Sequence, residues 1–192
     1  DLSVVADARV FLDGLLAHNE QLSDADRTPW LTRCRNWQER YPLLTDDQAD
    51  PSQPLSAYLF SATLIEELEA EDIIVPGSSG FACEIFLLMY RCKEGQRMFH
   101  NRGTGSMGFG LPASIGACLA SGGRRTICVD GDGGIQMNIQ ELETVCRLNL
   151  PIKLFVINND GFASIRSSQS GYFNQLVGAD STSGLTLPNI RR

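Results

Sequence analysis

The chain has 192 residues, of which 43% are hydrophobic and 20% are charged, a composition that is ordinary for a soluble globular protein. Its formal net charge of −7 argues against a nucleic acid or an anionic membrane as a partner, because the overall field repels polyanions. No apolar stretch reaches the roughly 18 residues of a membrane span. The six cysteines include no C-x-x-C pair, which argues against a zinc ribbon, and most of them lie in apolar stretches as buried thiols do, which favours a reducing, cytoplasmic location.

The N-terminal part of the sequence predicts two helices followed by a linker. Apolar residues at helical spacing place one helix within residues 4–18 and a second within residues 28–41, with Thr28 as the expected N-cap of the second. The polar, proline-containing stretch over residues 42–54 is typical of a linker. Because the first residue is Asp1 and not Met, we expect the chain to be processed or to be a piece of a longer protein.

From Leu55 onward, predicted helices and strands alternate. The expected helices cover residues 56–72, 81–92, 111–123 and 138–150, and the expected strands cover residues 73–75, 97–100, 125–129 and 152–157. This alternation, with glycine after most strands, predicts an α/β fold in which helices cover both faces of a parallel sheet. Beyond Gly161 the sequence is polar and has no periodicity that predicts a further element.

The residues that follow the predicted strands are rich in glycine, serine, aspartate and asparagine. Glycine- or serine-rich loops at 77–80, 103–110 and 131–134 follow three of the strands and are expected to meet at the edge where the strands end. Phosphate beside the carboxylate of Asp132 requires a divalent cation, and Mg²⁺ takes about six oxygen ligands. The side chain of Asn159, from the end of the next strand, offers a neutral oxygen. An alternative is a tight turn in which the aspartates act only as caps.

A second interpretation concerns the loop before the helix at 111–123. Gly103, Gly105 and Gly108 form a G-x-G-x-x-G pattern, and Asp130 follows at the distance expected of a ribose-binding acid. The pattern therefore also predicts a Rossmann module that binds NAD or FAD. That interpretation gives no role to Met107 or to the Asp132 and Asn159 loops.

The sequence resembles a known family. Asp132 within G-D-G, followed by Asn158–Asn159 after one helix and one strand, is similar to the signature of thiamine diphosphate-dependent enzymes. With "EDIIVPGSSG" and "GTGSMGFGLPASIGA", it makes residues 55–192 similar to the diphosphate-binding domain of the acetolactate synthase-like group, C-terminally incomplete. Residues 1–50 resemble, more weakly, the end of the preceding central domain and its linker.

This resemblance implies a role for each residue that matches the family motifs. Asp132 and Asn159 are the implied side-chain ligands of Mg²⁺, and Gly161 supplies a backbone carbonyl. Gly105 presents its carbonyl to the aminopyrimidine, and Met107 bends the cofactor so that the pyrimidine amino group meets the thiazolium ring. The full implied set of cofactor-binding residues is Gly77, Ser78, Ser79, Gly105, Ser106, Met107, Gly131, Asp132, Gly133, Gly134, Asn159, Gly161 and Phe162.

The resemblance also implies decarboxylation and carboligation of a 2-oxo acid such as pyruvate, with thiamine diphosphate and Mg²⁺ as cofactors and FAD possible in the whole protein. The activating glutamate comes from a pyrimidine-binding domain of the same or another subunit, in a homodimer or homotetramer, so the chain alone is expected to be inactive. Ile165 stands where pyruvate decarboxylases carry a catalytic glutamate, which favours carboligation over release of an aldehyde. A 2-oxo acid decarboxylase is the alternative, and Arg166 is a candidate for contact with a substrate carboxylate.

Overall fold

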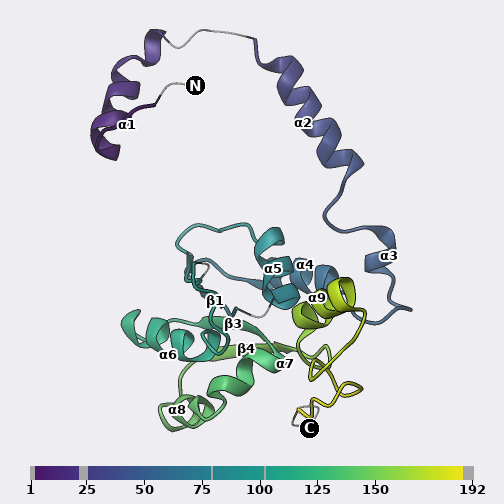
Figure 1. The fold of residues 1–192 in the computed structure, drawn as a ribbon. Coiled ribbons are helices and arrows are strands. Elements are labelled where there is room, and N and C mark those ends of the chain that lie inside the picture. Colours follow the sequence, from purple (N-terminus) through teal and green to yellow (C-terminus); the bar gives the residue numbers. More distant parts are fainter. Residues whose placement is uncertain (1–2, 22–25, 79, 102, 188–192) are drawn as a thin grey trace. The chain divides into compact units, whose positions relative to one another are not determined.

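The computed structural model describes residues 3–21, 26–78, 80–101 and 103–187 (Figure 1). The chain divides into two compact units, residues 1–42 and residues 43–192. The first unit consists of helices, which are α1 (Ala8–Ala17), a 3-10 turn (Asn19–Gln21) and α2 (Thr28–Arg40). Both helices predicted from the sequence are present.

The caps of these two helices differ from each other. The Asp7 side chain caps α1 by accepting the N–H groups of Arg9 and Val10 at 3.0 and 3.3 Å. The N-cap of α2 is Arg27, so the prediction of Thr28 as the N-cap was wrong. The Asp26 carboxylate accepts the N–H of Thr28, the first residue of α2, at 2.9 Å. Asp26 therefore makes the kind of hydrogen bond to a helix N-terminus that a capping side chain makes.

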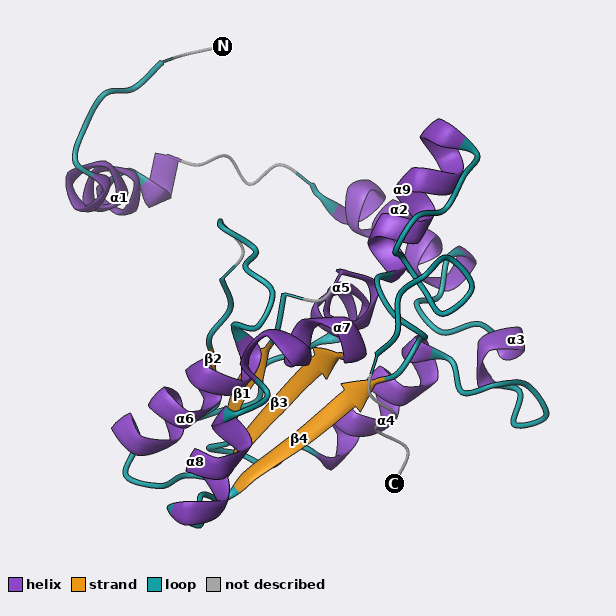
Figure 2. Cartoon of the chain, turned by 60° about the horizontal axis from the view of Figure 1, so that its bottom comes forward, coloured by secondary structure: helices purple, strands orange, loops and turns teal. Residues whose placement is uncertain are grey.

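The second unit is an α/β domain. Its strands are β1 (Ile73–Pro76), β2 (Arg97–Met98), β3 (Thr126–Gly131) and β4 (Ile152–Ile157). Its helices are α3 (Asp46–Ala49), α4 (Ala57–Glu67), α5 (Gly80–Met89), α6 (Gly110–Ala120), α7 (Asp132–Ile135), the 3-10 helix η2 (Gln136–Asn138), α8 (Glu141–Arg147) and α9 (Ala163–Phe173). All strand pairs are parallel, in the order β2-β1-β3-β4, and Figure 2 shows the larger strands running in one direction.

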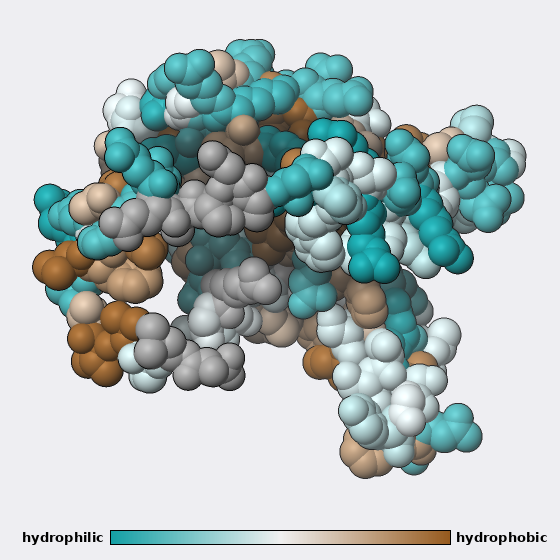
Figure 3. All heavy atoms as spheres, turned by 90° about the horizontal axis from the view of Figure 1, so that it is seen from above, coloured by the Kyte–Doolittle hydropathy of each residue, from teal (hydrophilic) through white to brown (hydrophobic). Residues whose placement is uncertain are grey.

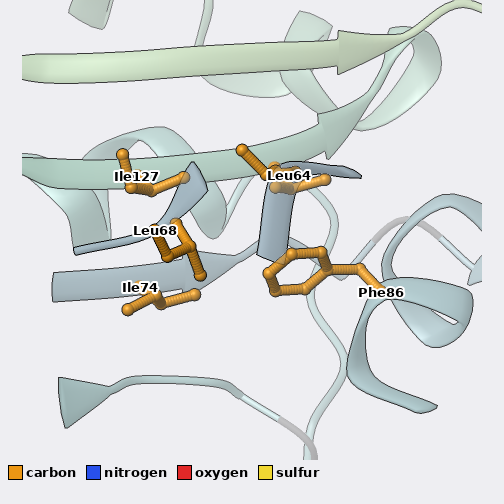
Figure 4. Packing of buried hydrophobic residues seen from close by; sticks show 6 residues of the cluster. Leu64, Leu68, Ile74, Phe86 and Ile127 are labelled. Carbon is orange, nitrogen blue, oxygen red and sulfur yellow. The ribbon is translucent and has the colours of Figure 1, made fainter. Parts of the chain in front are cut away.

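Helices cover both faces of this sheet, as the sequence predicts. On one face, Leu64 and Leu68 at the end of α4 and Phe86 of α5 pack against Ile74 and Ile127 (Figure 4). On the other face lie α6, whose Leu111, Ile115 and Cys118 are buried, and α8 (Figure 1). Every residue of β3 is buried because this central strand is covered on both faces and paired on both edges. The predicted fold class is confirmed.

Several details of the second unit differ from the sequence prediction. Helix α3 lies within the stretch predicted as a linker, α4 ends at Glu67, and α8 covers only part of the helix predicted over residues 138–150. The edge strand β2 is limited to Arg97–Met98 and does not extend to His100. Strand β3 continues through Asp130 and Gly131, so α7 begins directly at Asp132. The segment after Gly161, for which no element was predicted, contains helix α9, which packs against α5. The serine-rich sequence of α9 shows no helical spacing of apolar residues, so contacts with the rest of the domain stabilise this helix more than its own sequence does.

The surface of the described residues mixes polar and apolar side chains. Trp30 and Trp37 of α2 are 56% and 47% exposed and meet edge to face, with ring centroids 5.8 Å apart. Hydrophobic residues also lie among hydrophilic ones on the face drawn in Figure 3. Among the described helices, none combines the length and the apolar character needed to cross a membrane.

Candidate functional site

The candidate site lies where three neighbouring strands end. Gly77 follows β1, Asp132 follows β3, and Asn158 follows β4. The strand register pairs Pro76 with Val129 and Gly131 with Ile157, so the three ends lie near one another along the same edge of the sheet. The glycine- and serine-rich segments after β1 and β3 therefore converge with the loop after β4, as expected for a parallel sheet.

A cavity of about 110 Å³ is present at this edge. Nine of the residues predicted for the site line it, namely Ser78, Met107, Gly131, Asp132, Gly133, Gly134, Asn159, Gly161 and Phe162. The other lining residues are Gly80, Phe81, Ala163, Ser164 and Ile165. Residues from four separate segments of the sequence thus share one small cavity. We call it the strand-end cavity.

A larger cavity of about 730 Å³ adjoins the first. The two share Ser78, Gly80 and Ser164, and the larger one is also lined by Gly77 and Gly105. The structure thus brings Gly77 and Gly105 to the same region as the other predicted residues.

Two predicted residues stand apart from this arrangement. Ser106 lines neither of the two cavities, and its hydroxyl accepts a hydrogen bond from Asn101 Nδ2 at 3.2 Å. In this geometry Ser106 supports the loop that carries Met107. Ser79 lies outside the described residues.

Asp132 joins two of the strand ends. Its side chain is buried, with 4% of the residue exposed. One carboxylate oxygen accepts the N–H of Gly133 at 2.9 Å, and the other accepts the N–H of Gly161 at 2.8 Å. The second bond crosses from the end of β3 to the loop after β4, so Asp132 and Gly161 are held together without a ligand.

Two side-chain oxygens that belong to this cavity lack a hydrogen-bond partner among the described residues. They are Ser78 Oγ and Asn159 Oδ1, and both atoms are buried. A buried polar atom without a partner costs about 1–3 kcal/mol, and such atoms in a native fold call for an explanation. Both residues line the same cavity as Asp132, so a cation would satisfy the Asn159 oxygen and an acceptor such as a phosphate oxygen would satisfy the Ser78 hydroxyl.

The set of possible metal ligands here contains a single carboxylate. The described residues contain no group of three or more His, Cys, Asp or Glu side chains that could bind a metal. A cation at Asp132 would therefore depend on neutral oxygens such as Asn159 Oδ1 and the Gly161 carbonyl, which also accepts the Ala163 N–H at 3.2 Å. One carboxylate with neutral oxygens suits Mg²⁺, which usually takes its other ligands from phosphates and water.

Close packing fixes two glycines of the site. A Cβ on Gly133 would lie 2.5 Å from Cδ1 of the Phe162 ring, so the aromatic ring rests directly on the backbone at this point. Gly161 has φ = +113°, a conformation that favours glycine, and a Cβ there would lie 2.6 Å from the carbonyl oxygen of Ala179. These contacts leave little freedom for the backbone around the strand-end cavity.

The loop that carries Met107 is held by two asparagines. Met107 is 36% exposed and lines the strand-end cavity. Asn138 of η2 donates from Nδ2 to the Gly108 carbonyl at 2.9 Å, and the Asn101 carbonyl accepts the Gly105 N–H at 2.7 Å. Sequence reasoning missed Asn138, because no local pattern shows that its side chain meets a loop thirty positions earlier in the chain.

Asp130 does not fit the role of a ribose-binding acid. It is fully buried, and one of its oxygens accepts the N–H of Gly131 at 2.8 Å. A Cβ on Gly77 would lie 2.4 Å from Asp130 Cγ, and a Cβ on Gly110 would lie 2.6 Å from Oδ2. The carboxylate is therefore enclosed by backbone, where a ribose cannot reach it.

Arg166 contacts backbone instead of pointing toward a substrate. Its Nη1 donates to the Asp160 carbonyl and its Nη2 to the Asn159 carbonyl, both at 2.9 Å. Nη1 also lies 3.7 Å from a carboxylate oxygen of Asp180. The candidate role of Arg166 as a substrate ligand therefore has no support in this geometry.

Comparison with known proteins identifies the family. Residues 78–190 match the family model described as "Thiamine pyrophosphate enzyme, C-terminal TPP binding domain", where thiamine pyrophosphate is another name for thiamine diphosphate. The chain is 30% identical to an acetolactate synthase large subunit of Cyanidium caldarium, over 91% of this chain and 29% of that protein. It is 30% identical to acetolactate synthase 2, chloroplastic, of Brassica napus, over 90% of this chain and 26% of that protein.

A third relative is the acetolactate synthase large subunit of Buchnera aphidicola, which is 33% identical over 73% of this chain and 24% of that protein. The chain thus spans about a quarter of the length of these curated relatives. The family model covers more than half of the chain and includes the strand-end cavity, which confirms the resemblance found in the sequence. The chain belongs to the thiamine diphosphate-dependent enzymes, whose C-terminal cofactor-binding domain it contains.

Proposed function

We propose that the strand-end cavity binds the diphosphate of thiamine diphosphate through one Mg²⁺ ion. The observation that carries the proposal is the pair of buried oxygens without a described partner, Ser78 Oγ and Asn159 Oδ1, beside the Asp132 carboxylate. In the proposal, Asp132 and Asn159 bind the ion through side-chain oxygens and Gly161 through its carbonyl. Diphosphate oxygens and water complete the shell that Mg²⁺ prefers.

The other cavity residues hold the diphosphate and orient the cofactor. Backbone N–H groups of Gly133 and Gly134 and the Ser78 hydroxyl are proposed donors to phosphate oxygens, with Ser79 added from the sequence match. Gly105 lines the larger cavity next to the first, which supports a contact between its carbonyl and the aminopyrimidine. Met107 lines the strand-end cavity, in keeping with its proposed role as the apolar residue that sets the bend of the cofactor.

The proposed reaction is decarboxylation of a 2-oxo acid such as pyruvate, followed by carboligation to an acceptor. When bound, thiamine diphosphate supplies a carbon nucleophile for the 2-oxo group and an electron sink for loss of CO₂. Ile165 lines the cavity and is 42% exposed. By the sequence resemblance it stands where pyruvate decarboxylases carry a catalytic glutamate, and its apolar side chain has no proton to give to a product. This position favours carboligation over release of an aldehyde.

The whole protein is proposed to act as a homodimer or homotetramer. A pyrimidine-binding domain of the same or another subunit is proposed to supply the activating glutamate, which makes the present chain inactive by itself, and FAD remains a candidate cofactor of the whole protein. A reducing compartment such as the cytoplasm is proposed because most of the cysteines lie in apolar stretches of the sequence, where buried thiols are common.

The experiment that tests this proposal incubates the full-length protein with pyruvate and a panel of acceptors, with and without thiamine diphosphate and Mg²⁺. The panel contains a second pyruvate, 2-ketobutyrate, an aldehyde and a keto-sugar, and products are identified by mass. A ligated product that requires both cofactors is the expected result. Acetaldehyde as the sole product would indicate a decarboxylase, and tight binding of NADH without thiamine diphosphate binding would overturn the proposal.

A further inference from the structure

A charged side chain that does not line the strand-end cavity holds the backbone of the Asn159–Gly161 loop. Arg166 of α9 spans the carbonyls of two consecutive residues, Asn159 and Asp160, at 2.9 Å each. The fork of a guanidinium suits two acceptors at once, and its hydrogen bonds are charge-assisted. Arg166 thus restrains the backbone of Asn159 while the Asn159 side chain lines the cavity.

A second segment packs on the same loop. We call residues 177–185 the Ala179 loop. The Ala179 carbonyl accepts the Phe162 N–H at 2.9 Å, and Ser181 donates from Oγ to an Asp160 carboxylate oxygen at 2.6 Å. Ala179 is fully buried, and its carbonyl lies so close to Gly161 that no side chain fits there. The Ala179 loop therefore limits where the Gly161 backbone can move.

Asp180 organises the Ala179 loop and faces Arg166. Its Oδ1 accepts the Thr182 hydroxyl at 2.8 Å and the Ser183 hydroxyl at 2.8 Å. The hydrogen bonds from Ser183 and then Thr182 lower the pKa of Asp180, so the carboxylate stays ionised near the guanidinium. The ion pair spans 3.7 Å, whereas the two carbonyl contacts are 2.9 Å each, so the carbonyl contacts give the stronger restraint.

We propose that Arg166 is a positioning residue that, with the Ala179 loop, fixes the Asn159 and Gly161 oxygens for a divalent cation. This inference rests on the proposed Mg²⁺ site. It assigns to Arg166 an effect on metal affinity without any contact with the metal or the substrate. Residues that orient metal ligands typically change metal affinity by about 10-fold to 100-fold when they are replaced.

The test uses the full-length protein in three variants. Arg166→Met keeps the apolar stem and removes both hydrogen bonds. Arg166→Lys keeps the charge, but an ammonium lacks the fork that bonds both carbonyls. Ser168→Ala is the matched control, because Ser168 is exposed on the same helix. Calorimetric titration measures the Mg²⁺ dissociation constant at saturating thiamine diphosphate, and thermal unfolding measures the Tm of the metal-free protein.

Arg166→Met is expected to weaken Mg²⁺ binding at least about 10-fold, with Arg166→Lys intermediate and weakened about fivefold. Ser168→Ala is expected to stay within about twofold of the unmodified protein, and the metal-free Tm values of all three are expected to agree within a few degrees. Mg²⁺ affinity of Arg166→Met within about twofold of the unmodified protein would overturn the inference. If Arg166→Met does not fold, Arg166→Lys decides, and unchanged affinity in that variant overturns it.

Asp132→Asn in the same titration separates this inference from the proposed function. Loss of Mg²⁺ binding in Asp132→Asn with normal binding in Arg166→Met would leave the metal site standing and remove only the positioning role. Normal binding in Asp132→Asn would remove the metal assignment itself, and with it the basis of the inference.

Discussion

Replacement of Asn159 by leucine should raise the stability of the ligand-free protein and lower the stabilisation that the bound cofactor gives. Asn159 Oδ1 is buried and has no partner among the described residues, a situation that costs about 1–3 kcal/mol. Leucine has a similar shape and no polar atom. Asn159→Leu is therefore expected to raise the stability of the ligand-free protein by up to about 1 kcal/mol, or about 2–4 °C in Tm.

The same substitution removes a proposed metal ligand. At a ligand concentration 100 times the dissociation constant, binding stabilises the unmodified protein by about 2.7 kcal/mol. Asn159→Leu is expected to lose most of this gain. The assay is thermal unfolding of the full-length protein with and without thiamine diphosphate plus Mg²⁺. Asn158→Leu is the control, because Asn158 is exposed and does not line the strand-end cavity.

The combined result distinguishes a ligand-binding oxygen from a structural one. A fall in ligand-free Tm together with the full shift on adding ligand would mean that Asn159 serves the fold and not the cofactor. A full loss of the shift in Asn158→Leu would mean that the effect is not specific to the cavity.

Three further predictions follow from the packing. Gly133→Ala is expected to destabilise the protein by about 1–3 kcal/mol in urea unfolding, because the new Cβ would overlap the Phe162 ring. Adding Phe162→Leu to this variant should restore part of the lost stability, and an unchanged urea midpoint for Gly133→Ala would refute the contact. Phe86→Ala should cost about 3–5 kcal/mol, since Phe86 is fully buried, and a loss below about 1 kcal/mol would contradict the described core. Burial raises the pKa of the Cys128 thiol to about 12, so iodoacetamide at pH 8 should modify exposed Cys146 and leave Cys128 unmodified until unfolding, as mass spectrometry of digests would report.

The sheet could be predicted because its strands are short apolar runs that end in distinctive loops. Strand β4 has the predicted bounds, and β3 differs only at its ends. Asp132 and Asn159 were placed together for the same reason, since consecutive parallel strands end at the same edge. The sequence therefore predicted that Asp132 and Asn159 line one cavity.

Helix α9 and the restraints around the site could not be predicted in this way. Gln169 of α9 exchanges two hydrogen bonds with the backbone of Val177, at 2.9 and 3.2 Å, and Arg166 bonds the loop before the helix. Such contacts depend on where the chain folds back after Phe173. Asn138, which holds Gly108 from a distant segment, eluded prediction for the same physical reason.

The proposed role of Asp132, to hold thiamine diphosphate through a divalent ion, is tested most directly by one binding measurement. The full-length protein is titrated with thiamine diphosphate in Mg²⁺ and again in EDTA, as the unmodified protein, as Asp132→Ala and as Asp47→Ala. Asp47 is an exposed carboxylate on α3, so Asp47→Ala removes the same single negative charge as Asp132→Ala and serves as its control. We expect Mg²⁺ to strengthen binding in the unmodified protein and in Asp47→Ala but not in Asp132→Ala. An equal effect of Mg²⁺ on the affinity of all three proteins would contradict the account.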